Sequence, residues 1–216
     1  MSKANAPMRT QVLAIRHGET EWNSEGRFQG HLNSVLNAQG LAQALSLGTR
    51  LASERFDLLI SSDLGRALQT ASAIAMSTGH EIVVEPRLRE RNMGIFQGLT
   101  AAEVKSRYPD DYTRFKANDP DYVIPGGESM RQLFERSVAC FTQLAERHAG
   151  MTLATVTHGG VLAMLYRHAR AMALDAPRDF TLHNTSVNRF HHRRHTWELL
   201  SWGDIGHLDR ALDDTQ

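Results

Sequence analysis

Apolar and polar positions along this chain follow two patterns: short apolar runs, and longer stretches in which apolar residues recur with helical spacing. Short runs bounded by turn residues are typical of strands buried on both faces of a sheet. They occur at 11–15, 57–60, 81–84 and 152–157. A last segment, 186–202, is rich in β-branched and aromatic residues and predicts a β-hairpin.

Between the apolar runs, apolar residues recur every three or four positions, which is the spacing of an amphipathic helix. Capping residues mark several helix ends: Asn37 precedes the first stretch, Gly79 follows the second and Gly150 follows the third. The predicted helices are 38–51, 64–78, 129–149 and 161–173, with a short helical piece at 101–107.

Strands that alternate with helices predict a mainly parallel central sheet, because each crossover helix must pack back onto a face of the sheet. The expected fold is a three-layer α/β/α sandwich, formed by residues 1–216 as a single domain. In sheets of this kind ligands bind at the carboxyl ends of the strands, beside helix N-termini. The candidate site is therefore expected at that end of the sheet.

From 94 to 128 the helical periodicity weakens, because Pro109, Pro120, Pro125 and the pair Gly126–Gly127 interrupt short helical pieces. We expect this segment to form a helical, lid-like excursion over the sheet edge. Loops of that kind often carry substrate specificity.

Charge and composition exclude several classes of function. The 216 residues include 24 basic and 24 acidic residues, which gives no general attraction to nucleic acid or to an anionic membrane. The opening segment, Met1–Thr10, has no apolar core, and no later stretch is long and apolar enough to span a membrane, so we expect a cytoplasmic protein. The single cysteine, Cys140, lies in an apolar helical stripe and is expected to be a buried structural thiol.

Three junctions after predicted strands carry unusual residues. They are Arg16-His17-Gly18, the run 62–66 that ends in Arg66, and Thr157-His158-Gly159-Gly160. A cation in the first turn of a helix, as Arg66 is, opposes the helix dipole, and a bound anion would reverse that penalty. Glycines such as Gly159 let backbone N–H groups approach the same anion.

Two arginines, two histidines and exposed amides around one point are typical of a phosphate-binding site, because the paired N–H groups of a guanidinium match the oxygens of a phosphate. We expect the rings of His17 and His158 to face each other across one phosphoryl group. An arginine-rich pocket should lower the pKa of both histidines, and a neutral imidazole is a competent nucleophile toward phosphorus.

Five ordered sequence blocks resemble the histidine phosphatase superfamily in its phosphoglycerate mutase-like branch. The blocks are 13–23 with 27–30, 61–71, 88–94, 127–129 and 157–160. After Gly30 the chain departs from the family pattern, with Asn33 and Val35 where an aspartate and a proline are common. We expect the local loop, rather than the chemistry, to differ.

The resemblance implies a role for each matching residue. His17 would attack phosphorus and become a phosphohistidine, while Glu90 would protonate the leaving oxygen and then activate water. The residues implied to hold the phosphoryl group are Arg16, Arg66, His158, Asn23 and Gln29. Apart from the resemblance, the backbone of Gly159 is expected to bind the same group, because a glycine lets its N–H approach closely.

Two other polar segments can each be interpreted in two ways. The run His191–His195 invites a metal or nucleic-acid interpretation, but its position predicts a polar hairpin turn, and adjacent strand residues point to opposite faces. No set of metal ligands is expected elsewhere in the chain. The run His183–Ser186 resembles a family segment near the pocket, and local turn chemistry accounts for it equally well.

Three functions fit these observations. The first is metal-independent hydrolysis of a small phosphorylated metabolite without a cofactor. The second is a phosphoglycerate mutase primed by a bisphosphoglycerate. The pair Glu90-Arg91 resembles the corresponding pair in mutases, although mutases usually carry a longer insertion before the residue that matches His158. The third is a non-catalytic phospho-ligand binding protein of the same fold. The sequence gives no oligomeric state.

Overall fold

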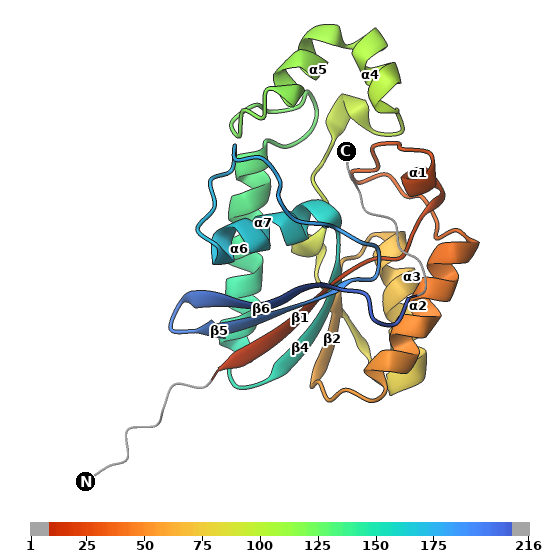
Figure 1. Cartoon of the computed structure of the whole chain (residues 1–216), viewed down its shortest axis with the longest axis vertical. Helices are drawn as coiled ribbons and strands as arrows, with labels where there is room; N and C mark the ends of the chain where they lie inside the picture. The colour runs from red at the N-terminus through yellow and green to blue at the C-terminus, as the bar shows by residue number, and fades with distance from the viewer. Residues whose placement is uncertain (1–8, 209–216) are drawn as a thin grey trace.

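The computed structural model describes residues 9–208, and its centre is a six-stranded mixed sheet (Figure 1). The strands are β1 (Thr10–Arg16), β2 (Leu58–Ser61), β3 (Ile82–Val84), β4 (Thr152–Thr157), β5 (Val187–Arg193) and β6 (Thr196–Asp204). Their order is β3-β2-β4-β1-β5-β6. The strands from β3 to β1 are parallel neighbours, whereas β5 pairs antiparallel with both β1 and β6. The mainly parallel sheet and the closing hairpin are as predicted.

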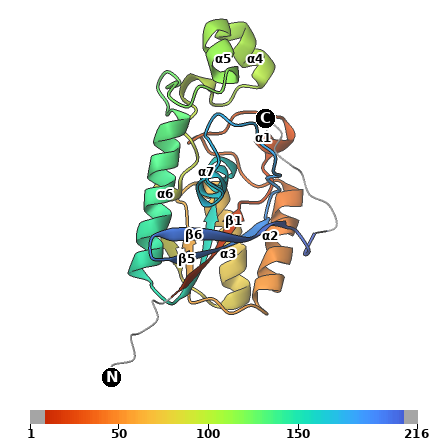
Figure 2. The ribbon, with the colours of Figure 1, turned by 60° about the vertical axis from the view of Figure 1, so that its left-hand side comes forward.

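Helices cover both faces of the sheet. They are α1 (Glu21–Ser24), α2 (Ala38–Leu51), α3 (Gly65–Thr78), α4 (Ala101–Arg107), α5 (Pro109–Lys116), α6 (Met130–Arg147) and α7 (Gly159–Ala169), with short 3₁₀ turns η1 (Pro86–Leu88) and η2 (Gly94–Phe96). Figure 2 shows α6 on one side of the sheet and α2 and α3 on the other. The three-layer α/β/α architecture is therefore confirmed.

Strand β1 shows why this sequence folds into layers. Leu13 and Ile15 pack into the apolar cluster under α2 and α3, while Val12 and Ala14 pack into the cluster under α6 and α7. All four side chains are fully buried. Alternate residues of a strand point to opposite faces, so an uninterrupted apolar run satisfies both clusters at once. The end of β1 is thereby held from both sides.

Several helix boundaries differ from the prediction. Helix α6 ends at Arg147 with His148 as its C-cap, so Gly150 lies in the turn before β4 instead of capping the helix. Helix α7 begins at Gly159, because His158 takes the extended conformation of an N-cap residue, and it ends at Ala169. Helix α1 was not predicted, since four residues are too short to show a period.

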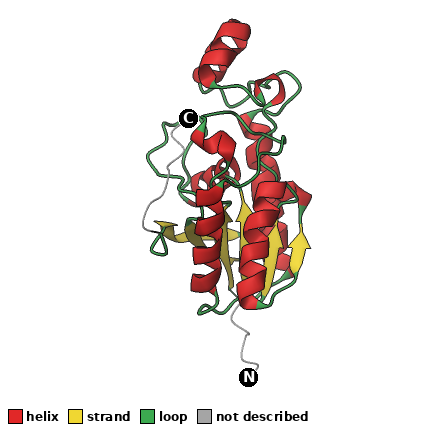
Figure 3. Ribbon diagram, turned by 90° about the vertical axis from the view of Figure 1, so that its right-hand side faces the viewer, coloured by secondary structure: helices red, strands yellow, loops and turns green. Residues whose placement is uncertain are grey.

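The segment 94–128 lies beyond the carboxyl ends of the strands rather than over a side edge of the sheet, and Figures 1 and 3 show it standing at one end of the molecule. Pro109, which we read as an interruption, is the first residue of α5, where its missing N–H costs nothing. The segment packs around a small apolar cluster of its own that includes Phe96, Val104 and Ile124.

Two remaining expectations concern the ends of the chain and membranes. The first eight residues of the segment Met1–Thr10, and residues 209–216 of the expected single domain, lie outside the described residues. Within residues 9–208, every helix is too short or too polar to cross a membrane.

Candidate active site

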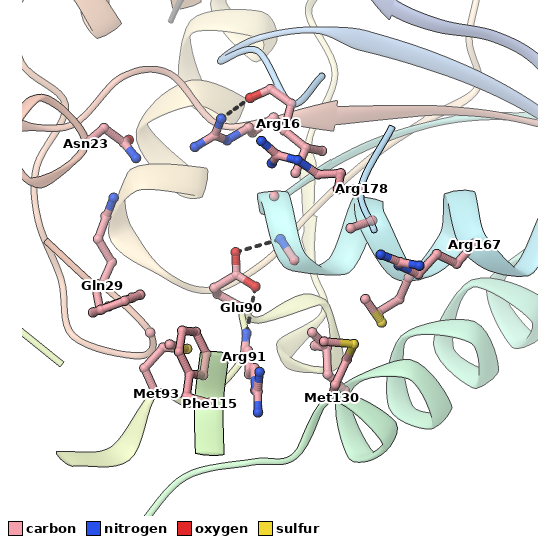
Figure 4. Close-up of a pocket in the computed structure, with 18 of the residues that line it drawn as sticks. Arg16, Asn23, Gln29, Glu90, Arg91, Met93, Phe115, Met130, Arg167 and Arg178 are labelled. Carbon is pink, nitrogen blue, oxygen red and sulfur yellow. Dashed lines mark hydrogen bonds between the residues drawn. The ribbon is translucent and has the colours of Figure 1, made fainter. Parts of the chain in front are cut away.

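A cavity of about 270 Å³ opens at the carboxyl ends of β1 and β4, beneath the segment 94–128 (Figure 4). Its inner half is formed by Arg16, His17, Arg66 and Glu90. The structure thus brings together residues that lie far apart in the sequence. This is the location expected for a ligand in a parallel sheet.

His17 follows β1 directly and is 2% exposed. Its Nδ1 lies 2.7 Å from the carbonyl oxygen of Gly18. A carbonyl only accepts hydrogen bonds, so Nδ1 carries the proton in the neutral ring and Nε2 keeps its lone pair. Burial, followed by the charges of Arg66 and Arg16, lowers the pKa of His17 well below 6.5. The ring is therefore neutral at pH 7, with a free lone pair on Nε2.

His158 follows β4 and is fully buried beside His17. The two ring centroids lie 5.2 Å apart with their planes at 57°. The structure thus brings the two rings together as expected, with their planes tilted rather than parallel. His158 Nε2 lies 2.8 Å from Ser62 Oγ, a contact that the sequence had not indicated. Burial, and then the charge of Arg66, lowers the pKa of His158 well below its usual value.

Arg16 and Arg66 place two cations deep in the protein, at 2% and 1% exposure. Arg16 donates a hydrogen bond to the carbonyl oxygen of Leu182. Arg66 donates to the carbonyl oxygens of Leu32 at 3.0 Å and Gly30 at 2.8 Å. Burial lowers the pKa of Arg66 to about 10, with Glu90 opposing the shift and Arg16 adding to it. Arg66 stays positive at pH 7, and neutral carbonyls do not cancel its charge, so the inner half favours an anion.

Glu90 is held by two backbone groups. Its Oε1 accepts a hydrogen bond from the N–H of Arg91 at 2.7 Å, and its Oε2 accepts one from the N–H of Gly160 at 2.9 Å (Figure 4). A methyl group on Gly160 would overlap Oε1 of Glu90. The glycine at the start of α7 therefore leaves room for this carboxylate.

The three predicted binding residues also line the cavity. Asn23 Oδ1 accepts hydrogen bonds from the backbone N–H and the hydroxyl of Thr20, at 3.1 and 3.0 Å, in the capping box of α1. The buried Oε1 of Gln29 has no hydrogen-bond partner among the described residues. Gly159 lies in the first turn of α7, where N–H groups and the helix dipole favour an anion.

The outer half of the cavity contains residues that sequence reasoning missed. They are Phe115, Tyr122, Met130, Arg167 and Arg178. Only the first two come from the segment 94–128, which we had expected to contact the leaving group. Arg167 lies in the last turn of α7, where a cation is common, so its type and position do not mark it, and no local signal marks Arg178.

The segment 183–186 supports the backbone of His17. Asn184 Nδ2 donates to the carbonyl oxygen of His17 at 3.0 Å, and the N–H of Thr185 donates to the same oxygen at 3.3 Å. Asn33, at the departure from the family pattern, lies against Gly65 at the start of α3. None of residues 183–186, nor Asn33 or Gly65, lines the cavity itself.

Two other sequence predictions concern residues away from the cavity. In the run 191–195, residues 191–193 end β5 and only Arg194 and His195 form the predicted hairpin turn, in which His195 pairs with Glu146 at 2.8 Å. Cys140 is buried, and burial raises the pKa of its thiol to about 12.

Comparison with known proteins agrees with this geometry. The model of the histidine phosphatase superfamily (branch 1) matches residues 12–205. A metal-independent phosphoserine phosphatase of Arabidopsis thaliana is 42% identical over 202 residues, which are 92% of this chain and 83% of the relative. Phosphoglycerate mutase-like protein 4 of the same plant is 39% identical over 205 residues, which are 93% of this chain and 88% of the relative.

A solved structure shows the same fold. Phosphoserine phosphatase from Entamoeba histolytica, in complex with phosphoserine, superposes with a TM-score of 0.82 at 27% identity and covers 92% of this chain and 99% of that one. Because the family model spans nearly the whole described chain, the protein belongs to branch 1 of the histidine phosphatase superfamily, a family of phosphatase and phosphoglycerate mutase-like enzymes.

Proposed function

We propose that this protein is a metal-independent phosphomonoesterase that acts through a phosphohistidine on His17. The observation that carries the proposal is the fixed tautomer of His17, whose Nδ1 is bound to the carbonyl of Gly18 in a cavity with two buried arginines. A neutral imidazole with its lone pair on Nε2, beside Arg16 and Arg66, suits in-line attack on a phosphoryl group.

In the first step, the Nε2 lone pair of His17 forms a bond to phosphorus while the bond from phosphorus to the leaving oxygen breaks. Glu90 donates a proton to that oxygen, so the product leaves as an alcohol. In the second step, water attacks phosphorus, Glu90 takes the proton from the water, and the bond from phosphorus to Nε2 breaks. Arg16 and Arg66 stabilise the negative charge that the phosphoryl oxygens carry in both steps.

The outer half of the cavity supports a small substrate with a charged leaving group. Arg167 and Arg178 lie on one side of it, and Met130 and Phe115 supply apolar surface (Figure 4). The Arabidopsis relative is a phosphoserine phosphatase, and the Entamoeba structure holds phosphoserine. We infer that the substrate is a small phosphorylated metabolite whose leaving group bears an anion, and that residues 94–128 help to select it.

The two arginines of the outer half, Arg167 and Arg178, also support a second candidate function. An anion-binding outer half would also retain a phosphoglycerate while its hydroxyl takes the phosphoryl group back from His17, which is the mutase reaction primed by a bisphosphoglycerate. Mutase-like relatives favour this alternative. Coupled detection of 2-phosphoglycerate from 3-phosphoglycerate, with and without the primer, separates the two reactions.

Trapping of the phosphoenzyme tests the proposal. Enzyme mixed with p-nitrophenyl phosphate and stopped in alkaline detergent should gain the mass of one phosphoryl group on the peptide that contains His17. The variant His17→Ala should lose both this adduct and turnover, whereas His195→Ala, in the exposed hairpin turn, should keep both. Turnover that survives in His17→Ala would reject the mechanism, and the absence of both adduct and turnover in the unmodified enzyme would favour the non-catalytic alternative.

A further inference from the structure

The block Gly127-Glu128-Ser129 belongs to the family resemblance, yet none of its residues lines the cavity. Ser129 caps α6, its Oγ accepting a hydrogen bond from the N–H of Gln132. A methyl group on Gly127 would overlap the carbonyl oxygen of Asn92, so this glycine permits a close approach of two backbone segments. These contacts explain why the block has Gly127 and Ser129, but they do not explain the residue between them, Glu128.

Glu128 forms a bidentate ion pair with Arg136, two turns further along α6. The distances are 3.0 Å from Arg136 Nε to Glu128 Oε1 and 2.9 Å from Nη2 to Oε2. The side chains are 22% and 21% exposed. Glu128 Oε2 also accepts a hydrogen bond from the N–H of Asn92 at 2.8 Å. The pair therefore links α6 to the segment that follows Glu90.

The other edge of the Arg136 guanidinium binds the segment that precedes and contains Glu90. Its Nη1 donates to the carbonyl oxygens of Arg87 and Arg89 at 2.8 and 2.9 Å, and its Nη2 lies 3.2 Å from the carbonyl oxygen of Glu90. His31 Nε2 lies 2.8 Å from that same oxygen. One guanidinium, on α6, thus joins three carbonyls of an irregular stretch to a carboxylate just before that helix.

We propose that Arg136, oriented by Glu128, is a positioning residue for Glu90. The inference rests on the proposed function, in which Glu90 is the general acid. Residues 89–92 have no helix or strand to hold them, so their backbone depends on such side-chain contacts. A proton donor displaced by about 1 Å from the leaving oxygen can cost on the order of 100-fold in rate.

The test uses substrates that differ in their need for an acid. An alkyl phosphate leaves only if its oxygen is protonated, whereas dinitrophenolate leaves without help. Arg136→Met should lower kcat/KM, which reports only the steps up to release of the leaving group, about 10- to 100-fold for an alkyl phosphate and less than about threefold for dinitrophenyl phosphate. Glu90→Gln should show the same selectivity with a larger loss. The double variant should lose nothing beyond Glu90→Gln, because the two side chains act through one proton transfer.

The matched control is Arg189→Met. Arg189 forms a bidentate pair with Glu54 at 21% and 25% exposure, close to the values for the pair under test, but it lies outside the cavity. Its loss should lower the Tm without changing the preference between the two phosphates. Glu128→Gln, which keeps the side chain's shape, replaces Arg136→Met if circular dichroism shows that the latter does not fold.

Three results would overturn the inference. Equal losses on both phosphates in Arg136→Met, with selective loss in Glu90→Gln, would make Arg136 a structural residue and leave the proposed function intact. Additive losses in the double variant would separate Arg136 from Glu90. Equal losses in Glu90→Gln itself would remove the general-acid role, and with it this inference, while phosphoenzyme trapping would still report on His17.

Discussion

The inner and outer halves of the cavity are built from different parts of the fold. Arg16 and His17 lie at the end of β1, and both are at most 2% exposed. Phe115 and Arg178, in the outer half, come from α5 and from the loop after α7, and both are partly exposed. The sheet thus places Arg16 and His17, whereas helices and loops place the groups that would meet the leaving group.

This difference follows from what holds each half in place. Strand β1 has hydrogen-bonded neighbours on both edges and apolar clusters on both faces. Helix α5 packs instead on the small cluster of the segment 94–128. Changes in the inner half should therefore alter the reaction itself, and changes in the outer half should alter which substrate is used. Substitutions in each half of the cavity can test this division between reaction and substrate choice.

The largest effect is expected from Arg66→Met. The variant removes a buried cation from the phosphoryl site, and losing such an arginine should lower kcat/KM by about 10³-fold for every phosphate tested. Arg50→Met is the control, because Arg50 pairs with Asp204 outside the cavity and is 25% exposed. A variant at position 66 that keeps more than a tenth of the activity, or that loses it for one substrate only, would contradict the division.

Part of the inner half could be predicted from sequence because Arg16 and His17 follow directly after an apolar run. His17 and His158 each precede a glycine at a strand end, and parallel strands end on one side of the sheet. The orientation of the two rings could not be predicted, because the contact between His158 and Ser62 joins separate strands. Arg178 reaches the cavity through a loop whose path depends on packing, and such packing leaves no local pattern.

The substitution Gly160→Ala tests how strongly the position of Glu90 affects the reaction. The new methyl group would overlap the end of the Glu90 side chain, which can rotate away, and alanine favours the first turn of a helix. The fold should therefore be at least as stable, while kcat for an alkyl phosphate should fall about 30-fold because the acid is displaced. Thermal unfolding and kinetics on alkyl and dinitrophenyl phosphates measure both effects. Equal rates for wild type and variant would show that the position of Glu90 does not limit the reaction.

The two neutral histidines that follow β1 and β4 should make stability depend on pH. Burial first, and then nearby arginines, lowers the pKa of His17 and His158 well below 6.5. As the pH falls below 6.5, the unfolded chain binds protons that the folded chain does not, so the free energy of unfolding decreases. Each histidine contributes about 1.4 kcal/mol per pH unit, a factor of about ten in the unfolding equilibrium.

Comparison with His17→Asn isolates one of these contributions. Urea unfolding of both proteins between about pH 7 and pH 5 should give a slope that is smaller in the variant by about 1.4 kcal/mol per pH unit. Other histidines with lowered pKa, such as His207 with a pKa of about 4, contribute equally to both proteins and cancel. Identical slopes would mean that His17 binds a proton in the folded protein.

The smallest effect is expected from Arg178→Gln, in the outer half. Arg178 is partly exposed, so its attraction for an anionic leaving group is screened by solvent and should contribute about 1 kcal/mol, or about fivefold in KM. Phosphoserine should show this rise in KM with kcat little changed, and p-nitrophenyl phosphate, whose leaving group has no carboxylate, should show none. An equal loss on both substrates would mean that Arg178 binds the phosphoryl group. Arg178 would then belong to the inner half, and the division proposed above would be wrong at this residue.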